Sequence, residues 1–334
     1  MIAITAPSMG VPNNFHARLD YVIKHLKAKG FRVTEGQCLR AVHKNVSNNR
    51  LTRAKELNGF LLHSEVKAIM PPWGGELAMD ILELIDFKQL SKCEPKWFCG
   101  YSDLSTLHMP LTTLAGWATL HSPNLMEFSI TAPDDTTEKI WNILQANRGA
   151  IVHQSSSLHY QTKPNNWALN PSGGFSLTVP TQWKRLDGES SPISFQGRLI
   201  GGCLETISRL AGTEFGDIPQ FVKQHATTGT ILYFESSELR PCALARALLS
   251  LKMQYWFNDL SGILVGRSST KEQEKGSTDQ LSYVDALKLA LGHLNIPIIY
   301  DVDIGHVPPQ VSLVNGVIAQ VNFSQIDCFI SQQL

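Results

Sequence analysis

Three residues of types that can carry out acyl transfer follow apolar stretches of this sequence: Ser102, Glu235 and His306. Ser102 comes after the run 96–101 and just before a helix-like stretch. A serine at a sharp strand-to-helix turn can present its hydroxyl group, with the next backbone N–H groups ready to receive an oxyanion. The local sequence Gly-Tyr-Ser-Asp-Leu-Ser departs from the Gly-x-Ser-x-Gly pattern of hydrolases. A helix N-cap is therefore the competing interpretation of Ser102.

Glu235 ends the apolar run 230–234, and His306 lies in a Gly/Pro-containing turn after the apolar run 296–300. In acyl transfer an imidazole takes the serine proton, and a carboxylate holds the imidazole in the right tautomer. Serine, carboxylate and histidine in this order therefore indicate a catalytic triad. The alternatives are Glu238 as the orienting acid, and His121, His108 or His63 as the base.

Asp301 and Asp303 lie near His306 and could suggest a metal site. No suitably spaced His or Asp partners occur elsewhere, so polar residues of a turn are the favoured interpretation. The opening strand leads into Met9-Gly10-Val11-Pro12 rather than Gly-x-Gly-x-x-Gly, which argues against a dinucleotide cradle. We expect neither a metal nor a cofactor.

Length and composition narrow the class of protein. A chain of 334 residues favours two domains, and 43% hydrophobic with 17% charged residues is typical of a globular enzyme. The formal net charge is zero and no long basic run occurs, which argues against a nucleic-acid polymer as partner.

The cysteines and the N-terminus indicate the cellular compartment. The six cysteines are widely spaced, without a Cys-x-x-Cys pair, and are expected to be reduced thiols. The first residues lack a basic leader, and no apolar stretch reaches membrane-spanning length. We expect a cytoplasmic protein with no membrane partner.

Residues 1–135 alternate strand-like and helix-like segments. Apolar residues at helical spacing predict a helix over 15–29 that stops at Gly30. Further helices are expected over 49–62, 76–85 and from Ser102 to about 115, with strands over 2–8, 66–70, 96–101 and 118–121. The fold class is therefore α/β, with an N-terminal doubly wound, mostly parallel, flavodoxin-like sheet.

The remainder of the chain is expected to form a linker and a second domain. Residues 136–196 contain many turn formers and are predicted to be a linker and substrate loop. Residues 197–334 predict a smaller C-terminal α+β domain that carries Glu235 and His306. Its expected strands are 230–235, 262–266, 296–300 and 317–322, after one at 176–179, and its helices are 204–210, 241–251 and 283–291.

The sequence resembles the LD-carboxypeptidase family of serine peptidases over nearly its whole length. The resemblance lies in the segments 67–76, 95–103 and 116–127, followed in the same order by 197–203, 232–235 and 305–306. The Pro-Pro-Trp-Gly-Gly-Glu and His-Ser-Pro-Asn-Leu-Met-Glu motifs are more similar to the branch of microcin C self-immunity proteins than to the murein tetrapeptide carboxypeptidases.

This resemblance implies a serine carboxypeptidase-like amidohydrolase with a triad of Ser102, Glu235 and His306. It places the oxyanion hole on the backbone N–H groups of Asp103 and Gly75. It also implies a homodimer and a small substrate, either a murein L,D-peptide or a peptidyl-nucleotide, cleaved near its carboxyl end.

Three further residues are candidates for substrate binding. The resemblance suggests Trp183 as an aromatic platform, and Trp73 could serve similarly, although packing within the protein is as good an explanation for both and for Trp167. Arg267 could pair with a substrate carboxylate, because guanidinium binds carboxylates in bidentate fashion. The rival function is a peptide or cell-wall-fragment binding protein on the same fold, without catalysis.

Overall fold

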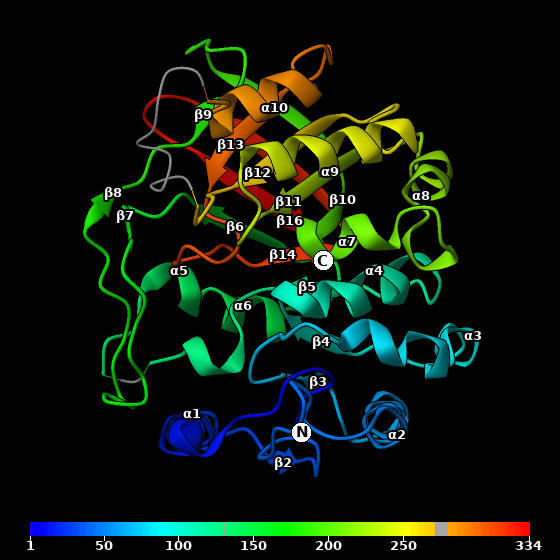
Figure 1. Ribbon diagram of the computed structural model, residues 1–334, viewed down its shortest axis with the longest axis vertical. Helices are drawn as coiled ribbons and strands as arrows, with labels where there is room; N and C mark the ends of the chain where they lie inside the picture. Colours follow the sequence, from blue (N-terminus) through cyan, green and yellow to red (C-terminus); the bar gives the residue numbers. More distant parts are fainter. Residues whose placement is uncertain (130, 271–279) are drawn as a thin grey trace.

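Two large sheets of the described residues pack against each other through helices (Figure 1). The structure is a computed structural model that describes residues 1–129, 131–270 and 280–334. The first sheet comes mostly from the N-terminal part of the chain, blue to cyan in Figure 1, and the second comes mostly from the green to red part. Among the described residues, none of the helices combines the length and apolar character needed to cross a bilayer.

The first sheet has the strand order β2-β1-β3-β4-β5-β14. All neighbouring strands are parallel except β14, which pairs antiparallel with β5. The order 2-1-3-4-5 is that of flavodoxin-like sheets, and this fold class is confirmed. The strands are β1 (Ile2–Ile4), β2 (Val33–Glu35), β3 (Ala68–Ile69), β4 (Trp97–Gly100), β5 (Thr119–His121) and β14 (Leu313–Asn315).

The helices of this half follow the βα pattern of the sequence. Helix α1 buries its Leu19, Val22, Ile23 and Leu26 stripe as the helical spacing predicts. The expected helix over 76–85 is instead the 3-10 helix η2, and side chains of Ser8 and Asp103 accept the Leu77 and Ala78 N–H groups at its start. The helical elements are η1 (Asn13–Phe15), α1 (His16–Ala28), α2 (Arg50–Leu62), η2 (Ala78–Leu84), α3 (Phe87–Leu90), η3 (Ser102–Leu104), α4 (Ser105–Thr113), η4 (Leu125–Glu127), α5 (Asp135–Glu138) and α6 (Ile140–Leu144).

The second sheet has the strand order β6-β16-β15-β10-β11-β12-β13-β9. Strands β10 to β13 are parallel, and the flanking strands are antiparallel. Strand β11 is buried along its whole length, which explains its continuous apolar sequence. The strands are β6 (Ile151–Ser155), β9 (Lys184–Arg185), β10 (Ile193–Cys203), β11 (Thr230–Glu235), β12 (Gly262–Gly266), β13 (Ile298–Val302), β15 (Ile318–Phe323) and β16 (Phe329–Gln333).

The helical elements of the second half are α7 (Leu204–Leu210), η5 (Glu214–Gly216), α8 (Ile218–Gln224), α9 (Pro241–Met253) and α10 (Tyr283–Leu291). Helix α4 packs against β10 and α7, and one buried apolar cluster includes Ile69, Leu107 and Leu232 from the two halves. An apolar interface of this kind fixes the two sheets relative to each other.

The segment 136–196, expected as linker and substrate loop, also supplies β6 and β9 to the second sheet. The expected strand 176–179 is shorter in the structure, where β8 (Val179–Pro180) pairs with β7 (His159–Tyr160). Both strands lie in the segment 158–184, the green arm of Figure 1. In the opposite direction, β14 from the C-terminal segment joins the first sheet. The chain therefore crosses between the two halves more than once.

Candidate active site

Ser102 stands at a sharp turn between β4 and α4, in the left-handed conformation with φ of 66°. A non-glycine residue in this region costs of order 1–3 kcal/mol, so its surroundings must hold it there. The Tyr101 N–H donates to Asn124 Oδ1 at 3.2 Å, and the Gly100 carbonyl accepts from His108 Nε2 at 2.8 Å. These two bonds anchor the strand end just before Ser102.

The carboxylate of Asp103 fastens the same turn from the other side. It accepts hydrogen bonds from Ser8 Oγ at 2.6 Å, from the Ala78 N–H at 2.8 Å and from Thr106 Oγ1 at 3.3 Å. Burial raises the pKa of Asp103, and these three donors partly oppose that effect. The Asp103 side chain thus joins three segments, while its backbone N–H remains next to Ser102.

The glycine turn Gly74-Gly75 approaches Ser102 closely. A Cβ atom on Gly74 would lie 2.9 Å from both Asp103 N and Ser102 Cβ. Gly75 has φ of 140°, where a Cβ would meet Ser8 and Met9. Within the described part of the chain, the N–H groups of Gly75 and Asp103 donate to no protein acceptor. The Asp103 amide directly follows Ser102, and the Gly75 amide lies in the turn whose Gly74 approaches that serine.

His306 lies between Ser102 and Glu235. Its Nε2 is 3.0 Å from Ser102 Oγ, and its Nδ1 is 2.7 Å from Glu235 Oε2. Glu235 is fully buried at the end of β11, and Gly305, with φ of 92°, leaves room for its carboxylate. Burial alone would lower the pKa of His306, but the charge and hydrogen bond of Glu235 outweigh it and raise that pKa.

The structure does not bring the alternative acid and bases to Ser102. Glu238 is exposed, and its N–H donates to Glu205 Oε1. His63 is exposed, and His108 bonds to a backbone carbonyl. His121 is fully buried, and burial lowers its pKa well below the usual range, so it stays neutral.

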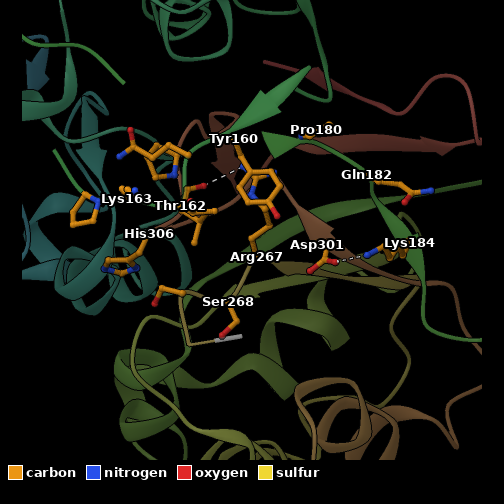
Figure 2. Close-up of a pocket in the computed structure, with 15 residues that line it drawn as sticks. Tyr160, Thr162, Lys163, Pro180, Gln182, Lys184, Arg267, Ser268, Asp301 and His306 are labelled. Carbon is orange, nitrogen blue, oxygen red and sulfur yellow. Dashed lines mark hydrogen bonds and ion pairs between the residues drawn. The ribbon is translucent and has the colours of Figure 1, made fainter. Parts of the chain in front are cut away.

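A cavity of about 400 Å³ opens beside His306 (Figure 2). Its charged lining consists of Lys163, Lys184, Arg267 and Asp301, with Lys184 Nζ 3.1 Å from the Asp301 carboxylate. Residues of the green arm, among them Tyr160 and Gln182, also line the cavity. The remaining lining residues are Gln161, Thr162, Pro164, Pro180, Ser268, Ser269, Val307 and Pro308.

Arg267 lines this cavity, but its guanidinium is occupied by protein groups. Nη1 bonds to Asp303 Oδ1 at 2.6 Å, and Nη2 donates to the carbonyls of Val307 at 3.0 Å and Pro309 at 2.8 Å. The group also stacks 4.8 Å from the Tyr160 ring centre. Among the described residues Nε has no hydrogen-bond partner, but it is buried, so the expected bidentate bond to a substrate carboxylate would have to displace the protein contacts of Nη1 or Nη2. Instead, Arg267 fastens the turn that carries His306.

Trp183 does not line the cavity, contrary to its expected role as an aromatic platform. It is 3% exposed, and its Nε1 donates to Asp303 Oδ2 at 2.7 Å. Trp73 packs edge-on against Phe15 and donates to the Met9 carbonyl at 3.0 Å. Both indoles are satisfied within the protein, and Tyr160 is the aromatic residue of the cavity instead.

Sequence reasoning placed Asp303 among the polar residues of a turn, but it predicted none of its partners. Asp303 accepts bonds from Arg267, Trp183 and the Ser157 N–H, and so anchors the His306 turn rather than a metal. Among the described residues, no group of three or more His, Cys, Asp or Glu side chains is arranged to hold a metal ion. The only available signal for Asp303 was its position three residues before His306, in a turn rich in Gly and Pro.

Comparison with known proteins identifies similar chains. The model of the LD-carboxypeptidase N-terminal domain matches residues 2–122, and that of the C-terminal domain matches residues 196–321. The microcin C7 self-immunity protein MccF of Escherichia coli is 24% identical over 317 residues, covering 93% of this chain and 87% of that protein.

Solved structures that share the fold include MccF and a muramoyltetrapeptide carboxypeptidase. MccF in complex with glutamyl sulfamoyl guanosine has a TM-score of 0.83 at 21% identity, covering 100% of this chain and 95% of that chain. Muramoyltetrapeptide carboxypeptidase from Oxalobacter formigenes has a TM-score of 0.73 at 20% identity, covering 100% and 98%. The fold is thus more similar to MccF than to this murein enzyme.

Proposed function

This chain belongs to the LD-carboxypeptidase family, and we propose that it is a serine carboxypeptidase-like amidohydrolase with Ser102 as its nucleophile. The observation that carries the proposal is the position of His306, within hydrogen-bond distance of both Ser102 Oγ and Glu235 Oε2. This is the relation that nucleophile, base and orienting acid need in acyl transfer.

In the proposed reaction, Ser102 Oγ attacks the substrate carbonyl carbon while His306 Nε2 takes the hydroxyl proton. The tetrahedral oxyanion accepts hydrogen bonds from the Gly75 and Asp103 N–H groups. His306 then gives the proton to the leaving nitrogen, the C–N bond breaks, and an acyl ester remains on Ser102. Water, deprotonated by His306, hydrolyses that ester and restores the serine. Glu235 stabilises the imidazolium in both halves of the reaction.

The cavity beside His306 is the proposed substrate-binding site (Figure 2). Asp303 pairs with Arg267 and Asp301 pairs with Lys184, which leaves the exposed Lys163 as excess positive charge on the lining. We therefore propose an anionic group on the bound part of the substrate. The carboxylate of a small murein L,D-peptide and the phosphate of a peptidyl-nucleotide both meet this requirement, and MccF has been solved in complex with glutamyl sulfamoyl guanosine.

The proposal is tested with a fluorophosphonate probe that labels activated serines and with both substrate classes. Ser102→Ala should abolish labelling and lower turnover about 10⁶-fold. Ser64→Ala, which removes an exposed hydroxyl outside the cavity lining, is the matched control and should retain both labelling and turnover. If the wild-type protein is neither labelled nor active on either substrate, the chain is instead a binding protein on this fold.

Two further expectations accompany this function. We propose a cytoplasmic location, in keeping with six cysteines that are all unpaired in the structure. We also propose a homodimer, by extension from the family. Light scattering of the purified protein measures its oligomeric state, and a monomer at micromolar concentration would contradict the proposed homodimer.

A further inference from the structure

Glu127 is a carboxyl group close to the active site that the proposed triad does not use. It ends η4, the short helix that follows β5 in the first sheet. Its Oε2 accepts from the Asn124 N–H at 2.7 Å, which completes a capping box. Its Oε1 accepts from the Tyr101 hydroxyl at 3.0 Å. One oxygen thus fixes the local turn, and the other reaches the residue before Ser102.

Tyr101 is held at both ends by this short segment. Its N–H donates to Asn124 Oδ1 at 3.2 Å, and its hydroxyl donates to Glu127. The side chain is 7% exposed, so its position is fixed by packing as well as by these bonds. Tyr101 therefore has very little freedom relative to the nucleophile turn.

The ring of Tyr101 packs directly on the imidazole of His306. The ring centres are 4.8 Å apart at an interplanar angle of 66°, an edge-to-face contact. The two hydrogen bonds of His306 lie at opposite sides of its ring, so by themselves they do not fix its rotation about the line between Ser102 Oγ and Glu235 Oε2. The Tyr101 ring blocks that rotation.

We propose that Glu127 and Tyr101 are positioning residues, which hold the imidazole of His306 in line with Ser102 and place a second carboxylate near the imidazolium. This inference rests on the proposed function, because it assumes that His306 acts as the base. It adds a second set of contacts that position His306: Glu127 of η4 bonds to Tyr101, and Tyr101 packs on the imidazole. These contacts do not involve Glu235.

The charges around these groups support this positioning role. Burial raises the pKa of Glu127 to about 7, and the bonds from Asn124 and Tyr101 together with the charge of His306 oppose this effect. Asp134 lies near Glu127 as a second carboxylate, and the guanidinium of Arg18 in α1 lies near it as a cation. His306 is faced in turn by Glu235, Glu205 and Glu127, all of which raise its pKa, and by neutral His121.

The test compares Glu127→Gln and Tyr101→Phe with the wild-type protein, and it follows the rate of fluorophosphonate labelling of Ser102 against pH. Removing the Glu127 charge should lower the apparent pKa of the base by about half a pH unit. Tyr101→Phe should give a smaller shift in the same direction. Both variants should lower the plateau rate about fivefold, because each alters the hydrogen bond that orients the Tyr101 ring against His306. The plateau of the double variant should fall less than the product of the two single effects.

Asp134→Asn is the matched control, since it removes a nearby carboxylate that has no bond to Tyr101. It should not lower the apparent pKa. Thermal unfolding of each variant checks that it is folded; if Glu127→Gln is unfolded, Tyr101→Phe, which loses one oxygen atom, decides the test.

Unchanged pKa and plateau in a folded variant overturn the positioning role, and so does an equal shift in Asp134→Asn. Either result leaves the triad intact if the wild-type protein is labelled on Ser102. A wild-type protein that is not labelled on Ser102 overturns the proposed function itself, so the two failures are distinguishable.

Discussion

The two sides of the candidate active site are built differently. On the catalytic side, Ser102 and Glu235 lie at the ends of strands paired within the two sheets, and the His306 turn follows β13. On the cavity side, the segment 158–184 holds only two-residue strands, and it exposes Leu158 by 85% and Leu169 by 84%.

This structural difference suggests that the catalytic side determines the rate of the reaction and the cavity side determines which substrate binds. Buried strand ends hold reacting groups to a fraction of an ångström, as general acid–base catalysis requires. Short strands and exposed loops tolerate change, because few buried contacts depend on them. Substitutions on the catalytic side should therefore change kcat, whereas those on the cavity side should change KM. The four predictions below test that division, from the largest effect to the smallest.

Glu235→Gln should lower kcat about 10⁴-fold with little change in KM, because the amide keeps the shape but loses the charge that orients and stabilises the imidazolium. Steady-state kinetics on the active substrate measures this. Glu238→Gln is the control and should behave as wild type, since Glu238 is exposed. A greater loss in Glu238→Gln than in Glu235→Gln would reverse the assignment.

Gly74→Ala should lower kcat about 10²–10³-fold, the size of losing one oxyanion donor. The added Cβ would stand 2.9 Å from Asp103 N and displace the turn from Ser102. Gly59→Ala is the control, because nothing lies within 4 Å of its added Cβ and alanine favours the helix α2. Equal activity of the two variants would show that this close approach has no catalytic role.

The value of kcat/KM should fall tenfold for each pH unit below the midpoint of its pH profile, and this midpoint should lie above the ordinary histidine pKa of 6.5. The reason is that protonated His306 cannot accept the serine proton, and Glu235 raises the pKa of this group. Because the pKa of His306 is higher in the folded than in the unfolded state, its protonation stabilises the fold. This stabilisation is fully present below the unfolded-state pKa and is lost as the pH rises through the folded-state pKa. A midpoint of kcat/KM below 6.5 would contradict this.

Lys163→Gln should raise KM roughly three- to tenfold and leave kcat nearly unchanged, because an exposed cation contributes modestly to anion binding. The wild-type KM should also rise with added salt, more than that of the variant. Lys92→Gln, an exposed lysine outside the cavity lining, serves as the control. A change confined to kcat would place Lys163 on the catalytic side.

Much of the framework was predictable from local pattern. Strands β11 and β12 and helices α7 and α10 begin and end at the predicted residues, because each is a continuous apolar or amphipathic run with clear boundaries. Strands β6, β14 and β16 were missed, since no unbroken apolar run marks them within segments rich in turns. Their pairing depends on partners far away in the sequence.

The sequence by itself determined the α/β fold class, the family and which serine, carboxylate and histidine follow strands, because these depend on local periodicity and motif spelling. The tertiary structure decided which groups meet. It brought His306 to Ser102 and Glu235 across 204 and 71 positions of the chain, and it placed Trp183 and Arg267 on Asp303. A buried indole or guanidinium takes whatever acceptor the packing supplies, and no local pattern encodes that partner.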